Sequence, residues 1–372
     1  MQRVMAMRLR LLQRPVRIVA QSNAAFSTKA PEFSDIVYGQ DTGRLHKIEA
    51  NKTVNAVVFS GNGGKAFCAG ATSARWPTME KIRQRATSRS TFSVTKAIIS
   101  FLNGVTMGGG VGLSMHGKFV VATEKTLFAM PETAIGFFPD VGASHLLPRL
   151  GRRLIEGEDY VADVPKSQAL KDRLGTYLAL TGERLKGHEV IGLGLATTTC
   201  PQRVRDAGAR DEMIHEALEE LETDEAFQEI DPVLETVESV FGALNDNDTM
   251  EGIFERLEKL NTEWSQETLA TLKKMSPLSL KVTLEQMRQG AVKTCAECFQ
   301  MEYRMATRMM ENPDFFEGVR SVVVDKDRNP KWSKRDITKV TAKEVEAFFK
   351  PLDKDQELIL YPSATAVTEK EE

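Results

Sequence analysis

The sequence is poor in several features that would assign it to a class at once. It has only four cysteines, too few for a disulfide framework in 372 residues, which favours a reducing compartment. It has no run of eighteen or more apolar residues, so the sequence predicts no membrane span. Basic and acidic side chains nearly balance, 49 against 52, so no global field draws the protein to nucleic acid or anionic lipid. The remaining composition, 41% hydrophobic, is that of a globular protein with a large core.

Acidic residues are missing from the first 31 positions, where the composition differs in kind. This segment carries Arg3, Arg8, Arg10, Arg14, Arg17 and Lys29 and has no acidic residue before Glu32. It ends in small and hydroxyl residues around Ser27. Such a composition predicts a transit peptide for the mitochondrial matrix over residues 1–31, and the alternative is a disordered basic tail.

Short apolar runs predict a layered α/β core over residues 32–200. We expect strands at residues 54–60, 97–102, 118–122 and 126–129, separated by glycine-rich turns and helix starts. The charged, weakly periodic segment 151–173 is typical of a surface excursion.

Helical spacing replaces the strand signals after about residue 208. We therefore expect a helical C-terminal region over residues 201–350 and a polar tail over 351–372. One helix is predicted in detail: Ser276 caps it, Pro277 takes its first position, and Leu280, Leu284 and Met287 share one face.

Two glycine- and alanine-rich segments follow predicted strands. They are AFCAGA (residues 66–71) and NGVTMGGGVGL (residues 103–113). Small residues let the backbone approach a ligand closely, and a helix start leaves N–H groups unpaired. Two such donors aimed at one point would form an oxyanion hole for acyl chemistry. The alternative for GGG is a tight turn, and the segment lacks the Lys and Ser/Thr of a phosphate-binding loop.

A third segment, FAMPETAIGFFPDVG (residues 128–142), supplies two carboxylates. Glu132 stands among apolar residues, where a carboxylate is costly unless it is paired or functional, and Asp140 follows eight residues later. Alternatively, Glu132 caps a helix and Asp140 opens a turn. A separate CAEC at Cys295 and Cys298 favours two small buried residues over a redox or zinc role.

Seven segments together resemble the 3-hydroxyisobutyryl-CoA hydrolases of the crotonase superfamily. They are AFCAGA, VTMGGGVGLSMHG, ATEKTLFAMPETAIGFFPDVG, YLALTGERLKG, SLKVTLEQM, MEYRM and FFEGVRSVVVDKDRNPKW, in that order. The last is specific to this branch, whereas the paired glycine segments are shared by the whole superfamily. The resemblance implies a crotonase-like spiral of ββα units with a helical C-terminal region, and an acyl-CoA thioester substrate.

The resemblance also implies roles for particular residues. Ala71 and Gly109, with Gly108 beside them, match the positions whose backbone N–H groups hold the thioester oxygen. Glu132 and Asp140 match the acidic pair. The resemblance implies no metal and no cofactor, since coenzyme A is part of the substrate, and a homo-oligomer is possible. Hydratases of the superfamily carry a second glutamate at the position of Gly112, so hydration of an alkene is the weaker interpretation.

Four features depart from the family pattern. Two are substitutions: Thr72 replaces an aspartate, and the family's usual acidic residue and tyrosine are replaced by Arg83, Gln84 and Arg85. Two are changes of length: residues 32–52 are short for a first strand and helix, and residues 151–173 look inserted. One explanation is an error in the gene structure near residues 32–52 and 151–173.

The other explanation is a non-catalytic relative in the mitochondrial small ribosomal subunit. It would use basic residues without intervening acids to meet RNA phosphates: Lys81, Arg83, Arg85, Arg89, Lys96 and Lys118. The alternative for this stretch is a solvated helix face.

Overall fold

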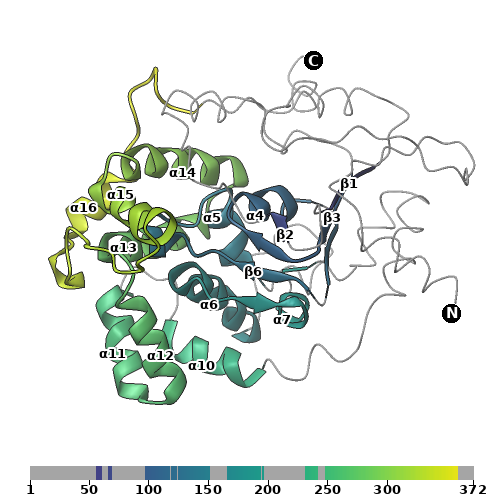
Figure 1. Ribbon diagram of the computed structural model, residues 1–372, viewed down its shortest axis with the longest axis horizontal. Coiled ribbons are helices and arrows are strands. Elements are labelled where there is room, and N and C mark those ends of the chain that lie inside the picture. Colours follow the sequence, from purple (N-terminus) through teal and green to yellow (C-terminus); the bar gives the residue numbers. More distant parts are fainter. Residues whose placement is uncertain are drawn as a thin grey trace, which may run out of the picture.

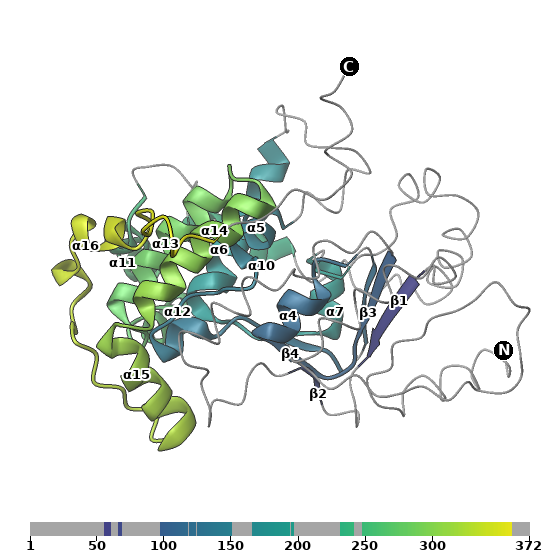
Figure 2. The same ribbon diagram turned by 90° about the horizontal axis from the view of Figure 1, so that it is seen from above.

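The computed structural model describes residues 56–60, 66–68, 97–117, 119–123, 125–150, 166–193, 195–196, 231–241 and 248–358. The strands lie together on one side and most of the helices on the other, and α4 lies between them in both views (Figure 1, Figure 2). The predicted transit peptide, the short segment 32–52 after it and the six residues of the basic stretch fall outside these residues.

Two sheets form the strand side. The first has the order β1-β3-β5, all parallel, and the second has the order β2-β4-β6-β7, in which only β7 is antiparallel. The strands are β1 (Ala56–Ser60), β2 (Ala66–Cys68), β3 (Ala97–Leu102), β4 (Val105–Met107), β5 (Phe119–Ala122), β6 (Leu127–Ala129) and β7 (Leu185–Lys186). The four predicted strands are confirmed within one or two residues.

The chain adds strands to the two sheets in turn. Each repeat places one strand in the first sheet and the next in the second: β1 and β2, then β3 and β4 followed by helix α4 (Gly109–Ser114), then β5 and β6. At the corners, the backbone N–H of Leu127 donates to the carbonyl of Gly104, and the Thr123 hydroxyl donates to the Asn103 side chain. These bonds satisfy polar groups where the chain leaves one sheet for the other. The architecture confirms the predicted spiral of ββα units.

Helices make up the rest of the described chain. The helices are η3 (Glu132–Ile135), α5 (Ala143–Leu146), η4 (Leu147–Arg149), α6 (Lys166–Thr181), α7 (Gly187–Gly192), α10 (Asp231–Phe241), α11 (Met250–Leu260), α12 (Glu263–Leu272), α13 (Pro277–Gly290), α14 (Cys295–Met309), α15 (Pro313–Val319), η7 (Arg320–Val324), η8 (Ile337–Lys339) and α16 (Ala342–Ala347). The prediction of a surface excursion over residues 151–173 is wrong for its later part, because α6 begins at Lys166.

The starts of the later helices follow the sequence closely. Ser276 caps α13 by accepting the backbone N–H of Ser279, with Pro277 at the first helical position, as predicted. Leu280, Leu284 and Met287 are all buried, as the shared face required. The remaining C-terminal helices α11, α12, α14, α15 and α16 also begin at a threonine or asparagine whose side chain accepts a backbone N–H.

Two clusters of buried side chains hold the halves together. The larger runs from the strands through α6 and α10 to α13, so the strand and helix sides share one core. The smaller joins Phe137 and Phe138 to residues of α13 to α16, including Met305 and Phe315. Phe137 stacks on Phe138 with centroids 4.5 Å apart and lies 5.3 Å from Phe315. The segment between the two predicted carboxylates is therefore fixed to the helical half.

Candidate active site

Three neighbouring parallel strands end at one edge of the second sheet. Cys68 at the end of β2 pairs with Thr106 of β4, and Met107 at the end of β4 pairs with Ala129 at the end of β6. Carboxyl ends of parallel strands meet at one edge, which is where open α/β sheets bind ligands. The structure thus brings the ends of β2, β4 and β6 side by side, although these strands are far apart in sequence.

Helix α4 begins directly after β4 and packs tightly on the end of β2. Gly108 precedes it with a positive φ of 52°, and Gly109 is its first residue. A side chain at Gly110 would meet the carbonyl oxygen of Cys68 at 2.4 Å, so this helix can approach β2 only with glycine there. Ala71, three residues beyond Cys68, lies outside the described residues. The predicted convergence of its amide with that of Gly109 stays a prediction.

Glu132 lies at the same edge, three residues after β6. It is the first residue of the short 3-10 helix η3 and its side chain does not cap it, so that alternative is wrong. Glu132 is only 8% exposed, and its Oε2 has no hydrogen-bond partner among the described residues. Burial raises the pKa of this carboxyl well above its ordinary value, and the nearby charge of Asp140 raises it further. A buried carboxyl with an unused oxygen is suited to accept or donate a proton.

Asp140 lies in a tight turn that leads into α5. Its carbonyl accepts the backbone N–H of Ala143 at 3.0 Å, so it does open a turn, through its main chain. The side chain is partly buried, and burial raises its pKa to about 6. The charge of Asp140 is one of the causes that raise the pKa of Glu132, which indicates that the two carboxyls lie in one region. Two interacting carboxyls in one apolar site do not both ionise readily at neutral pH.

The turn after Asp140 closes the space beside Gly112. A side chain at Gly112 would meet Cβ of Val141 at 2.5 Å and its Cγ2 at 2.9 Å. The position that would need a second glutamate for hydratase chemistry is therefore filled by a neighbouring residue. The sequence shows the missing glutamate, and the structure adds that there is no room for one.

The structure brings one further carboxylate to this region that sequence reasoning missed. Glu302 of α14 is 5% exposed, and burial raises its pKa to about 7. Its oxygens accept hydrogen bonds from the turn after Asp140. A signal for it was present, because Glu302 stands on the same helix face as the buried Cys298 and Met305, where a charged residue is unexpected. Thr72 and the segment Arg83 to Arg85 lie outside the described chain.

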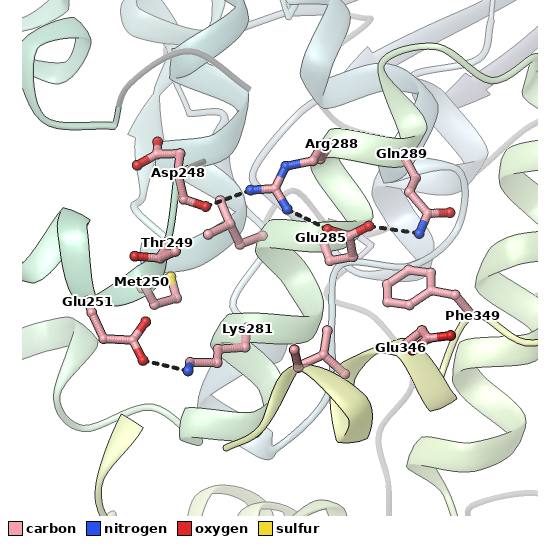
Figure 3. A pocket seen from close by; sticks show the side chains of 13 residues that line it. Asp248, Thr249, Met250, Glu251, Lys281, Glu285, Arg288, Gln289, Glu346 and Phe349 are labelled. Atoms are coloured by element: carbon pink, nitrogen blue, oxygen red, sulfur yellow. Dashed lines mark hydrogen bonds and ion pairs between the residues drawn. The ribbon is translucent and has the colours of Figure 1, made fainter. Parts of the chain in front are cut away.

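A separate hollow of about 260 Å³ lies between α11, α13 and α16, and it contains neither Glu132 nor Asp140 (Figure 3). Its charged side chains are engaged with one another: Lys281 with Glu251 at 2.5 Å, and Arg288 with Glu285 at 2.5 Å. The hollow is a seam between helices and holds none of the predicted site residues.

The two cysteines of the CAEC segment behave as packing residues. Cys298 is buried, Cys295 is half-buried, and neither forms a disulfide. Burial raises the pKa of Cys295 to about 12 and that of Cys298 to about 11, so both stay protonated thiols of low reactivity. In the part of the chain that the structure describes, no group of three or more His, Cys, Asp or Glu side chains could hold a metal ion. None of the helices described is both long and apolar enough to cross a bilayer.

Comparison with known proteins gives a consistent result. The family described as enoyl-CoA hydratase/isomerase matches residues 42–349. A 3-hydroxyisobutyryl-CoA hydrolase of Dictyostelium discoideum is 38% identical over 335 residues, covering 81% of each chain, and that of Homo sapiens is 37% identical, covering 83% of this chain and 80% of its own. A crystal structure of an enoyl-CoA hydratase from Rhodobacter sphaeroides is 30% identical with a TM-score of 0.68, covering 86% of this chain and 91% of that one. A carnitinyl-CoA dehydratase from Mycobacterium thermoresistibile is 27% identical with a TM-score of 0.66, covering 85% and 88%.

The fold and these matches together define the class: the chain belongs to the enoyl-CoA hydratase/isomerase family, whose fold is that of the crotonases. Within it, the chain is 36–38% identical to proteins named as mitochondrial 3-hydroxyisobutyryl-CoA hydrolases. The predicted family is confirmed.

Proposed function

We propose that this protein hydrolyses 3-hydroxyisobutyryl-CoA to the free acid and coenzyme A, a step of valine breakdown. The observation that carries the proposal is the pair of interacting carboxyls, Glu132 and Asp140, beside the carboxyl ends of β4 and β6. The extent of similarity to the hydrolases, about four fifths of both chains, supports the choice of substrate.

The reaction needs one carboxyl that accepts a proton or attacks, and one group that manages the proton. In the overall change, water adds its hydroxyl to the acyl carbon, the C–S bond breaks, and the second proton of water goes to the departing sulfur. We assign the two roles to Glu132 and Asp140, because burial raises the pKa of both carboxyls and the charge of Asp140 raises that of Glu132 further. Such a pair favours a state in which one carboxyl is protonated and the other is ionised. We assign the thioester oxygen to the backbone N–H groups of Ala71 and Gly109, at the ends of β2 and β4.

Hydration of an alkene is disfavoured within the same family. It would call on a second glutamate at Gly112, where Val141 leaves no space for a side chain. No observation favours the ribosomal alternative, since the relatives compared above are named as hydrolases and all six basic residues that motivated it lie outside the described residues.

The test is a thioesterase assay of the purified full-length chain, with release of the coenzyme A thiol as the readout. Glu132→Gln should lower kcat by about 10²-fold to 10⁴-fold, the range of general acid–base groups. Glu311→Gln is a matched control, because Glu311 is an exposed glutamate just after α14. A folded wild-type protein that releases no coenzyme A from 3-hydroxyisobutyryl-CoA, but hydrates an enoyl-CoA, would refute the proposal.

We also propose that the protein works in the mitochondrial matrix. The basic, acid-free segment 1–31 supports this, as do the names of the relatives. Fusion of residues 1–31 to a fluorescent protein should direct it to mitochondria, and the same segment with its arginines replaced by glutamine should leave it in the cytosol.

A further inference from the structure

The turn that carries Asp140 has an unfavourable backbone. Val141 has a φ of 57° and Gly142 a φ of 88°, two successive residues in the left-handed region. Glycine adopts this conformation readily, but a β-branched residue such as valine does so only under strain. Such a backbone persists only where contacts around it fix it, so the question is which groups hold this turn.

Helices from the other end of the chain hold it. The Gln286 side-chain amide of α13 donates to the carbonyl of Pro139 at 2.6 Å. On α14, the Glu302 carboxylate accepts the backbone N–H of Gly142 at 2.7 Å through Oε2, and the N–H and hydroxyl of Ser144 at 3.0 and 2.5 Å through Oε1. His116 contacts the carbonyl of Val141 at 2.9 Å. The turn is therefore tied on both sides of Asp140.

Glu302 makes more of the hydrogen bonds that hold this turn than any other side chain named above. It is 5% exposed, and a buried carboxylate is costly unless hydrogen bonds or charges compensate it. It accepts three hydrogen bonds, and these offset the cost of its burial. Both of its oxygens are occupied, whereas Oε2 of Glu132 has no partner in the described chain. The contrast separates a carboxylate that holds structure from one that is available for chemistry.

We infer that Glu302 is a positioning residue for the proposed hydrolysis: by binding Gly142 and Ser144 it fixes the strained turn and sets Asp140 against Glu132. The inference rests on the proposed function only for the part that concerns catalysis. It assigns the residue no contact with the substrate.

The first variant is Glu302→Gln. One oxygen becomes an NH₂ group, which cannot accept the N–H of Gly142 or the bonds from Ser144, so at least one of these donors is left unpaired. We expect kcat to fall by about 10-fold to 100-fold, since displacement of a catalytic group by about 1 Å has that effect. KM should change by less than about twofold, because the inference gives Glu302 no contact with the substrate. Glu311→Gln, the same change on an exposed residue, should alter neither constant.

The second variant, Ser144→Ala, removes one bond and leaves the carboxylate and both backbone bonds in place. It should fold even where Glu302→Gln is poorly stable, and kcat per folded molecule should fall by about threefold to tenfold, consistent with loss of one hydrogen bond of ordinary strength. Unchanged kcat per folded molecule in both variants would overturn the inference.

Amide hydrogen exchange supplies a readout that needs no enzymatic activity. In wild type the N–H groups of Gly142 and Ser144 should be protected, and in Glu302→Gln both should exchange faster, while the peptide containing Glu311 and its neighbours is unchanged. Faster exchange in a protein whose wild type has no thioesterase activity would refute the hydrolase proposal and leave the structural role standing. Equal exchange in both proteins would refute the structural role itself.

Discussion

Carboxylates in two regions of this molecule have opposite electrostatic environments. At the strand edge, burial raises the pKa of Glu132 and Asp140. On the surface at the end of α15 and just beyond it, hydrogen bonds to Arg320 lower the pKa of Glu317 and Asp327 to about 2. The same chemical group is destabilised as an anion in the first region and stabilised in the second. Only the first arrangement keeps a proton within reach at neutral pH, which is what acid–base chemistry requires.

The two regions also differ in which parts of the chain hold their carboxylates in place. The surface carboxylates are paired with the Arg320 cation, and their hydrogen bonds all lie within residues 317–331. The site carboxylates depend on distant parts of the chain, because the turn at Asp140 is tied to α13 and α14, about 150 residues later. Substitutions should therefore affect activity strongly in the first region and hardly at all in the second.

The largest effect beyond Glu132 is expected for Asp140→Asn. Loss of one member of the pair should lower kcat by about 10²-fold or more. Because the charge of Asp140 raises the pKa of Glu132, its removal should lower that pKa and move the acid limb of the residual pH–rate profile to lower pH. The measurement is kcat for coenzyme A release between pH 4 and 9. An acid limb that does not move would mean that the two carboxyls are not coupled.

The next effect concerns stability and its pH dependence. The folded pKa of Asp140 is raised from 3.8 to about 6, so between these values the folded state binds more protons and stability falls as pH rises. Asp140→Asn removes this loss. The variant should gain stability relative to wild type by up to about 3 kcal/mol between pH 4 and pH 8, from 1.36 kcal/mol for each pKa unit. Urea unfolding at both pH values measures it, and a pH-independent difference would contradict the raised pKa.

A steric change in stability, of similar or smaller size, is expected for a substitution at Gly112. Gly112→Ala places Cβ 2.5 Å from Cβ of Val141, and overpacking of this kind costs about 1 to 3 kcal/mol. It should also lower kcat, because Val141 adjoins Asp140. The matched control is Gly252→Ala in α11, where the new Cβ would approach no atom more closely than the Arg256 guanidinium at 3.3 Å and the Thr249 hydroxyl oxygen at 3.5 Å. That variant should be as stable as wild type or more stable, since alanine favours helix over glycine.

The sequence was sufficient for the local features of the fold and insufficient for the long-range ones. Strands β1, β3, β5 and β6 follow from apolar runs, and the cap at Ser276 follows from residue chemistry over three positions. Glu132 and Asp140 could be selected because a carboxylate among apolar residues is unusual wherever it is folded. These are all properties of a few consecutive residues.

What the sequence could not provide depends on contacts between distant segments. The bonds from Glu302 to the Asp140 turn join residues about 160 positions apart, and no spacing rule relates them. The closure of Gly112 by Val141 depends on a positive φ at a valine, which local preference argues against. Tertiary packing decides both. The start of α6 within the segment expected to be an excursion was missed because its periodicity is weak.

The smallest effect is expected at the surface cluster, with Glu317→Gln. Arg320 also contacts Asp325 at 2.7 Å and Asp327 at 2.6 Å, so two anions remain with it after the change. Exposed ion pairs contribute little and are screened by salt, so kcat should be unchanged and the unfolding midpoint should fall only slightly, less at high salt. The pKa of Glu317 is lowered to about 2, so its contribution is present above the unfolded value and lost as pH falls through about 2. The midpoint difference between wild type and variant should therefore shrink between pH 4 and pH 2. A loss of kcat as large as that of Asp140→Asn would show instead that the two regions are not independent.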